Sequence, residues 1–135
     1  MSHSTPPFAM RSTTRLPFEQ AVARVTELLQ EEGFGVITEI DVQATLKKKL
    51  DLDHAPYLIL GACNPSLAHQ VLEVEPLIGV LLPCNVVIWQ EEDHCVVAAM
   101  EPLMMSRFVQ NATLETVARK VSGSLSRILE TMHGA

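Results

Sequence analysis

The sequence predicts an α+β domain in which a single, mostly antiparallel sheet carries helices packed on one face. Two long stretches place apolar residues at helical spacing, and several shorter stretches are typical of strands, two of them joined by a short polar turn. Apolar residues make up 47% of the 135 residues and aromatic residues only 4%, so the predicted core is aliphatic. A chain of this length can fold as one domain without a disulfide or a metal.

The N-terminal part predicts a tail, a strand and a helix. Residues 1–7 are polar and contain prolines, and we expect a disordered tail ahead of one domain over residues 8–135. The threonine-containing stretch 8–15 is expected to form the first strand. Pro17 suits the first position of a helix, and Gly33 suits its end because glycine readily adopts a positive φ. Between them, apolar residues recur at helical spacing at Phe18, Val22, Val25 and Leu29.

A second strand and a short helix are predicted next. Residues 34–41 alternate as a strand does. One face would carry Phe34, Val36, Thr38 and Ile40, and the other Gly35, Ile37, Glu39 and Asp41. Asp41 is also expected to cap a short helix over residues 42–50, whose three lysines near the end interact favourably with the helix dipole.

The third strand is expected over residues 57–63, which are apolar on both faces and therefore suit a central position. The pair Asn64-Pro65 favours the start of a helix, with asparagine as the N-cap and proline as the first residue. Pro76 is expected to stop that helix, since proline lacks the N–H that a continuing helix needs.

The last third predicts a hairpin and a long helix. Residues 79–90 are expected to form one long strand bent at Pro83, or two strands, paired with residues 94–100. Asn111 or Thr113 then begins the last helix. Its apolar stripe consists of Leu114, Val117, Val121, Leu125, Ile128 and Leu129.

The net charge and the number and spacing of the cysteines indicate which partners and which cellular location to expect. Ten Lys and Arg residues against sixteen Asp and Glu give a net charge of −6, which argues against nucleic acid or an anionic membrane as a partner. The longest apolar run, residues 77–89, is too short to span a bilayer. Three irregularly spaced cysteines without a recognisable signal peptide favour the cytoplasm. Neither a phosphate-binding loop nor a Gly-x-Ser-x-Gly nucleophile motif occurs.

Thiols and an imidazole are the main candidates for chemistry. Cys63 directly precedes the predicted N-cap Asn64, where the helix dipole favours a thiolate, and His69 follows in the same helix. Cys84 has a similar setting after Pro83. The alternative interpretation is that these cysteines are small apolar residues at buried strand ends. A zinc site would use Cys63, His69 and Cys84, with a carboxylate such as Glu39, although no paired ligand motif supports it.

Carboxylates offer a second candidate. Glu39 and Asp41 are two residues apart on a strand and therefore project from the same side, as an acid–base pair or a cation site requires. The simpler interpretation is a solvated strand face with Asp41 as a helix cap. The lysines at 47–49 are most simply a solvated helix end.

Several stretches resemble one known family. Residues 31–42, 57–65, 79–86 and 98–102 are similar to the prokaryotic family Domain of Unknown Function 302, with Glu101 where its members often carry aspartate. The resemblance implies a fold like that of the TATA-binding protein, β-α-β(4)-α, often paired as a homodimer, without implying DNA binding. The motif residues that it points to are Glu39, Asp41, Lys47, Cys63, Asn64, His69, Pro83, Cys84 and Asn85.

Three functions follow as hypotheses. The first is a homodimeric module that binds a small molecule or a metal ion beside Cys63, His69 and Cys84, with Asn64, Asn85 and Lys47 as further ligand contacts. The second is a thiol-dependent enzyme using Cys63, with Glu39 or Asp41 moving protons. The third is a non-catalytic protein-interaction domain.

Overall fold

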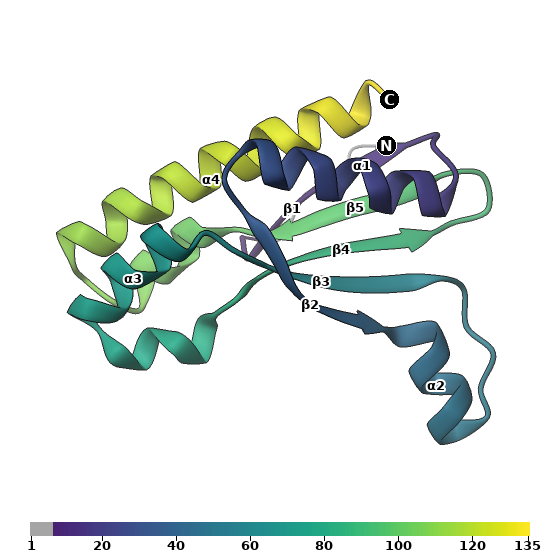
Figure 1. Ribbon diagram of the computed structural model, residues 1–135, viewed down its shortest axis with the longest axis horizontal. Helices are drawn as coiled ribbons and strands as arrows, with labels where there is room; N and C mark the ends of the chain where they lie inside the picture. Colours follow the sequence, from purple (N-terminus) through teal and green to yellow (C-terminus); the bar gives the residue numbers. More distant parts are fainter. Residues whose placement is uncertain (1–6) are drawn as a thin grey trace.

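The chain folds around one five-stranded sheet (Figure 1). The computed structural model describes residues 7–135, and the predicted tail therefore lies, apart from Pro7, outside the described residues. The elements in chain order are β1 (Ala9–Thr14), α1 (Phe18–Glu31), β2 (Gly35–Asp41), α2 (Val42–Leu50), β3 (Tyr57–Cys63), α3 (Pro65–Val74), the 3₁₀ helix η1 (Pro76–Leu81), β4 (Cys84–Gln90), β5 (Cys95–Met100), the 3₁₀ helix η2 (Pro102–Arg107) and α4 (Ala112–His133).

The sheet confirms the predicted α+β class. Its strand order is β1-β5-β4-β3-β2, and every neighbouring pair is antiparallel. The predicted hairpin is β4 and β5, joined at the polar turn, where Gln90 pairs with Cys95. When the short helices are left out, the order of elements is β-α-β-β-β-β-α, as the family resemblance implies.

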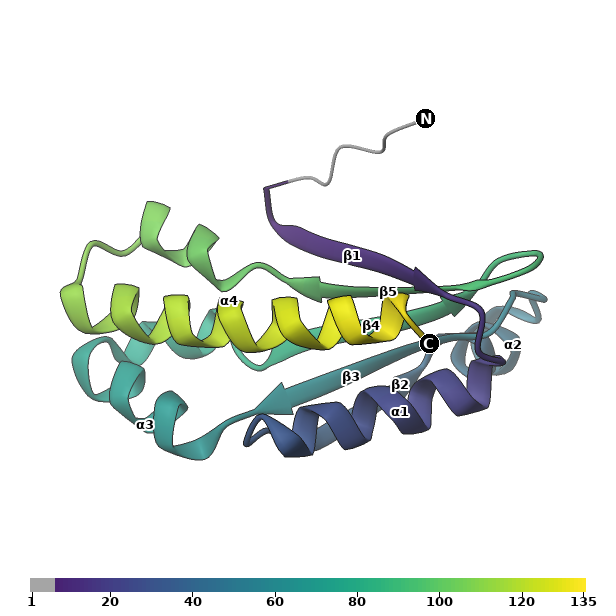
Figure 2. The same cartoon turned by 90° about the horizontal axis from the view of Figure 1, so that it is seen from above.

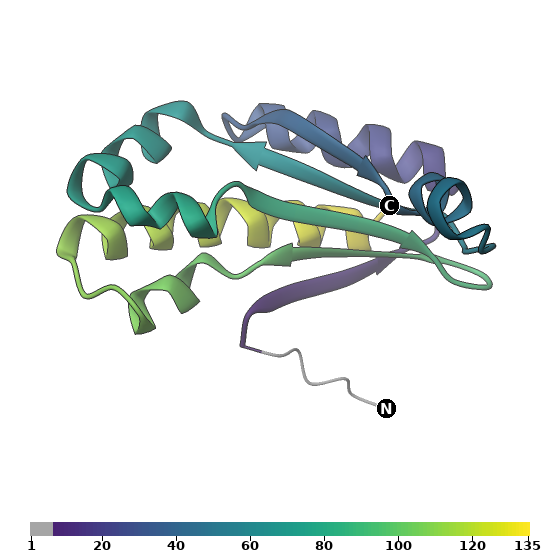
Figure 3. The ribbon, with the colours of Figure 1, turned by 90° about the horizontal axis from the view of Figure 1, so that it is seen from below.

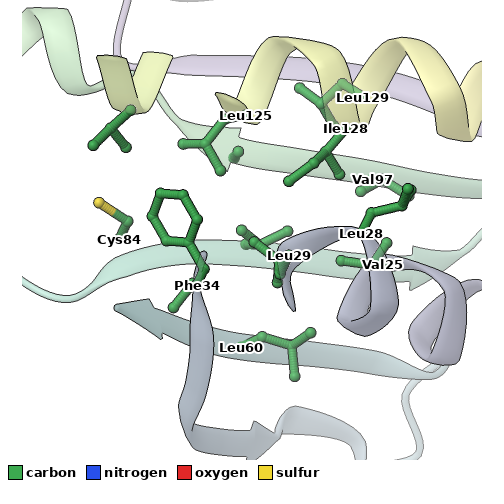
Figure 4. Close-up of a cluster of buried hydrophobic side chains, with 14 of the residues drawn as sticks. Val25, Leu28, Leu29, Phe34, Leu60, Cys84, Val97, Leu125, Ile128 and Leu129 are labelled. Carbon is green, nitrogen blue, oxygen red and sulfur yellow. The ribbon is translucent and has the colours of Figure 1, made fainter. Parts of the chain in front are cut away.

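Two long helices cover one face of the sheet. In Figure 2, α1 and α4 run side by side in opposite directions above the strands. Their apolar stripes meet the sheet in an aliphatic core, part of which Figure 4 shows. At the surface, the Arg127 Nη2 of α4 donates a 2.7 Å hydrogen bond to Glu32 Oε1 at the end of α1, and this bond lowers the pKa of the Glu32 carboxyl.

The predicted helix ends are present in the structure, except that α1 begins at Phe18 and Pro17 is its N-cap residue and not its first residue. Gly33 follows α1 with a φ of 87°, a conformation that glycine adopts without a Cβ clash. Three side chains cap helices by accepting backbone N–H groups: Asp41 from Ala44 for α2, Asn64 from Leu67 for α3, and Asn111 from Thr113 and Leu114 for α4. These local bonds explain why the helix starts were predictable from sequence.

The segment before β4 corrects the prediction of a strand from residue 79. Residues 76–81 form η1, and β4 begins only at Cys84. Pro76 occupies the first turn, and the Glu75 carboxylate accepts a 3.1 Å hydrogen bond from the Leu77 N–H. A capped proline start favours a helical turn, whereas the apolar composition alone had suggested a strand.

A second correction concerns the faces of β2. The register against β3 shifts between Val36, which pairs with Ala62, and Thr38, which pairs with Gly61. Ile37 is therefore an extra residue in a bulge, which exchanges the faces of the strand beyond it. Val36 faces the helices, while Thr38 and Ile40 face the opposite side of the sheet. Glu39 and Asp41 do share one face, as expected, and their partners on β3 are Leu60 and Leu58.

The other face of the sheet has no helix lying across it (Figure 3). Helix α2 projects from the end of β2, and none of its residues is buried. Among residues 7–135, no helix is both long and apolar enough to cross a membrane.

Candidate functional site

An apolar cavity of about 320 Å³ lies where β3 runs into α3 and where β4 begins. Helix α4 closes it from above, and η1 and η2 contribute at the sides. Its walls are hydrocarbon except for two thiols and one amide. The main lining residues are Phe34, Ala62, Cys63, Asn64, Leu67, Val71, Cys84, Met105, Val117, Ala118 and Val121.

Both predicted cysteines reach this cavity because their strands are neighbours. Cys84 pairs with Ala62 in the β3–β4 ladder, and Cys63 is the next residue of β3. Cys84 is buried at the edge of the core, near the Phe34 ring in Figure 4, whereas Cys63 is half-buried. Within residues 7–135 all three cysteines, including Cys95, are free thiols.

The environment keeps Cys84 protonated at neutral pH. Burial raises the pKa of the Cys84 thiol to about 11, and the charge of a neighbouring Cys63 thiolate adds to the increase. Burial also raises the pKa of Cys95. Because the thiolate is the reactive form of cysteine, this raised pKa disfavours Cys84 as a nucleophile.

Asn64 has a structural role at the cavity. Its side-chain oxygen accepts a 3.2 Å hydrogen bond from the Leu67 N–H and so caps α3. The same side chain lines the cavity, and it is the one amide in the lining. The Asn64 amide therefore places hydrogen-bonding groups beside otherwise apolar walls.

His69 does not join the two thiols. Its side chain is 74% exposed on the outer face of α3, where Nε2 lies 3.8 Å from Glu73 Oε1. No group of three or more His, Cys, Asp or Glu side chains in the described part of the chain is placed to hold a metal ion. The predicted ligand set of Cys63, His69 and Cys84, with Glu39, is not assembled, because the helical turn that positions His69 directs it away from the sheet.

The predicted carboxylates and lysine also lie elsewhere. Asp41 caps α2 through a 2.9 Å bond from the Ala44 N–H, and Glu39 is exposed on the edge strand. Lys47 Nζ pairs with Asp51 at 3.0 Å and Asp53 at 3.2 Å. None of these three residues lines the cavity, so the structure provides Cys63 with no neighbouring proton-transfer group from this set.

Asn85 lies on the opposite side of the sheet from the cavity. It follows Cys84 in β4, and successive residues of a strand point to opposite faces. It lines a separate groove on the face without helices. Two of the predicted ligand contacts, Asn64 and Asn85, therefore belong to different surfaces.

Sequence reasoning missed most of the cavity wall. Phe34, Val117 and Val121 were identified only as apolar residues of a strand or a helix stripe. Ala118 lies beside this stripe and carries no separate signal. An apolar residue that lines a cavity has the same periodicity as one in the packed core, so no sequence signal separates the two.

The fold and cavity define a small α+β domain with one helix-covered sheet face. The chain belongs to the family described as Domain of unknown function DUF302, whose model matches residues 8–132. It is similar to the crystal structure of an uncharacterized conserved protein DUF302 from Bacillus stearothermophilus. The TM-score is 0.85 and the sequence identity 29%, over 94% of this chain and 99% of that one. No curated protein matches the chain significantly.

Proposed function

We propose that the protein binds a small, uncharged, apolar molecule in the cavity beside Cys63 and Cys84. The observation that carries the proposal is a cavity of about 320 Å³ whose walls are almost entirely hydrocarbon. Protein interiors contain few voids larger than a water molecule, and small-molecule pockets begin at roughly 300 Å³. The volume thus suits a small ligand.

The lining determines the chemical class of the ligand. It contains no Asp, Glu, Lys, Arg or His side chain. A charged ligand would lose its hydration there without gaining an ion-pair partner, which is costly. An apolar ligand instead gains from leaving water, and the Asn64 amide accommodates one polar group. Cys63 is half-buried and Leu72 is 39% exposed at the rim, so the ligand has a route of entry.

The ligand-binding proposal is tested with 1-naphthylamine, an uncharged bicyclic probe whose emission reports an apolar environment. We expect saturable binding to the full chain and slower alkylation of Cys63 when the probe is bound. Ala118 is 1% exposed and lines the cavity, so Ala118→Leu should weaken binding by roughly tenfold or more, equivalent to about 1.4 kcal/mol.

The matched control is Ala44→Leu, which adds the same group at an exposed position of α2 and should leave binding unchanged. Equal affinity of the wild type and Ala118→Leu, with Cys63 alkylation unaffected by the probe, would exclude the cavity as the binding site.

The same proposal includes a homodimer formed through β2 and α2. Helix α2 places Val42, Leu46 and Leu50 along one side, yet it buries no residue in its own chain. Four large apolar side chains are at least half exposed in this region: Ile37 at 61%, Ile40 at 50%, Leu50 at 63% and Leu52 at 52%. Val42 and Leu46 are only half-buried within the chain. An incompletely covered apolar helix side next to an edge strand is typical of a contact between identical chains.

Replacing Leu50 with glutamate is expected to shift the dimer toward monomer, because the new charge would be desolvated in the contact. Light scattering over a range of concentrations measures the effect. Ala44→Glu adds the same charge on the opposite side of α2 and should leave the dimer intact. A wild-type protein that stays monomeric at all concentrations would contradict the proposal.

The three free thiols agree with a cytoplasmic location, which we propose as well.

A further inference from the structure

A second cavity, of about 440 Å³, lies on the sheet face that no helix covers. Residues paired across β1, β5 and β4 share this face: Ala9 pairs with Met100, and Ala98 pairs with both Arg11 and Val87. The two alanines form the floor of the cavity. Larger side chains line its two ends. We call this cavity, which extends from Phe8 and Met104 to Tyr57 and Trp89, the sheet groove.

One wall of the sheet groove is a row of stacked side chains. Tyr57 and Trp89 are register partners, and their rings stack at 5.5 Å with an interplanar angle of 8°. The Arg11 guanidinium lies 5.8 Å from the Trp89 ring centroid, in cation–π contact. Trp89 Nε1 donates to Glu91 Oε1 at 2.9 Å, which further restrains the indole. The contact with Trp89 therefore orients Arg11 without a carboxylate partner.

Arg11 is the one charged residue in the lining of this groove. Within residues 7–135 it forms no ion pair, although the chain as a whole carries a net charge of −6. Guanidinium groups bind carboxylate and similar oxyanions with paired N–H donors. The exposed Asn85 amide, also in the lining, adds further donors and an acceptor.

We propose that the sheet groove binds a small amphipathic anion, with its apolar body on Val87, Ala98 and Met100 and its carboxylate or sulfonate on Arg11. This site is separate from the cavity beside Cys63, because it lies on the other face of the sheet and shares no lining residue with it. The charge complementarity favours a single anionic ligand over a second copy of the chain. A symmetric contact here would bring two Arg11 side chains into an apolar interface whose lining offers no carboxylate, at a high desolvation cost.

The test compares 5-amino-1-naphthalenesulfonate with 1-naphthylamine, which has the same ring system without the anion. Trp89 is the single tryptophan of the chain, so quenching of its emission reports directly on this groove. We expect the sulfonate to quench Trp89 saturably. Arg11→Gln should weaken its binding roughly tenfold to a hundredfold, the range for loss of a charge-assisted hydrogen bond. Arg11→Lys should retain part of the affinity.

Two further variants separate the anion contact from a general loss of structure. Ala98→Glu places a carboxylate opposite Arg11 in the β1–β5 ladder, and it should weaken sulfonate binding while Arg11 remains. Lys120→Gln removes one exposed positive charge on α4 outside the groove and should leave binding unchanged.

Three results would overturn the proposal. One is equal sulfonate affinity of the wild type and Arg11→Gln, and another is binding without quenching of Trp89. The third is Trp89 emission that changes with protein dilution in step with dissociation of a dimer, which would assign this face to a second copy. Since 1-naphthylamine and Ala118→Leu test the other cavity, failure of either site is recognised without reference to the other.

Discussion

Replacing Phe34 with alanine is expected to lower the free energy of unfolding by about 3 kcal/mol, at the lower end of the range for a buried phenylalanine. The ring is 4% exposed and joins the main core to the cavity beside Cys84 (Figure 4). Because one side of the ring already borders an empty space, fewer packing contacts are lost than in a filled core. Denaturant unfolding monitored by circular dichroism measures the change.

Phe108→Ala is the control for this prediction. Phe108 is 72% exposed, so its removal should change the free energy of unfolding by no more than about 0.5 kcal/mol. Phe34→Ala should also enlarge the cavity and allow a bulkier uncharged probe than 1-naphthylamine to bind. A loss of less than about 1 kcal/mol, similar to that of an exposed residue, would show that Phe34 is not part of the core.

Replacing Gly61 with alanine is expected to cost about 1–3 kcal/mol, the usual cost of overpacking. A Cβ at this buried position in β3 would lie 2.1 Å from Thr38 Oγ1 and 2.9 Å from Pro83 Cγ. Both contacts are too short, and the proline ring cannot rotate away. The requirement for glycine arises from close packing of side chains around β3, since its φ is not positive.

A double-mutant cycle with Thr38→Ala tests this explanation, because removing the hydroxyl relieves the shorter contact. Gly61→Ala should therefore be less harmful when Thr38 is already alanine, with the Pro83 contact remaining. Gly35→Ala is the matched control on the neighbouring strand, where an added Cβ meets nothing within 4 Å. Strict additivity of the two substitutions would argue against the Thr38 contact.

The candidate site was predictable only in part. Cys63 and Cys84 were expected to share a cavity, and they line one, because each ends or begins a strand of the same ladder. His69 was expected there as well, but the turn of α3 places it toward solvent beside Glu73. A five-residue offset from the N-cap does not reveal which side of a helix the sheet will occupy. The aromatic row of Tyr57 and Trp89 with Arg11 joins β3, β4 and β1, and no spacing in the sequence indicates it.

The local signals of the sequence by themselves determined the order of elements and most of their ends. Pro17, Gly33, Asn64 and Asn111 act on backbone groups within a few residues, so their effect depends little on distant parts of the chain. Only the tertiary structure decided the strand order, the bulge at Ile37 and the two cavities. These features depend on contacts between residues distant in sequence. Hydrophobic periodicity indicates which face of a helix or strand is apolar, but it does not specify what that face packs against.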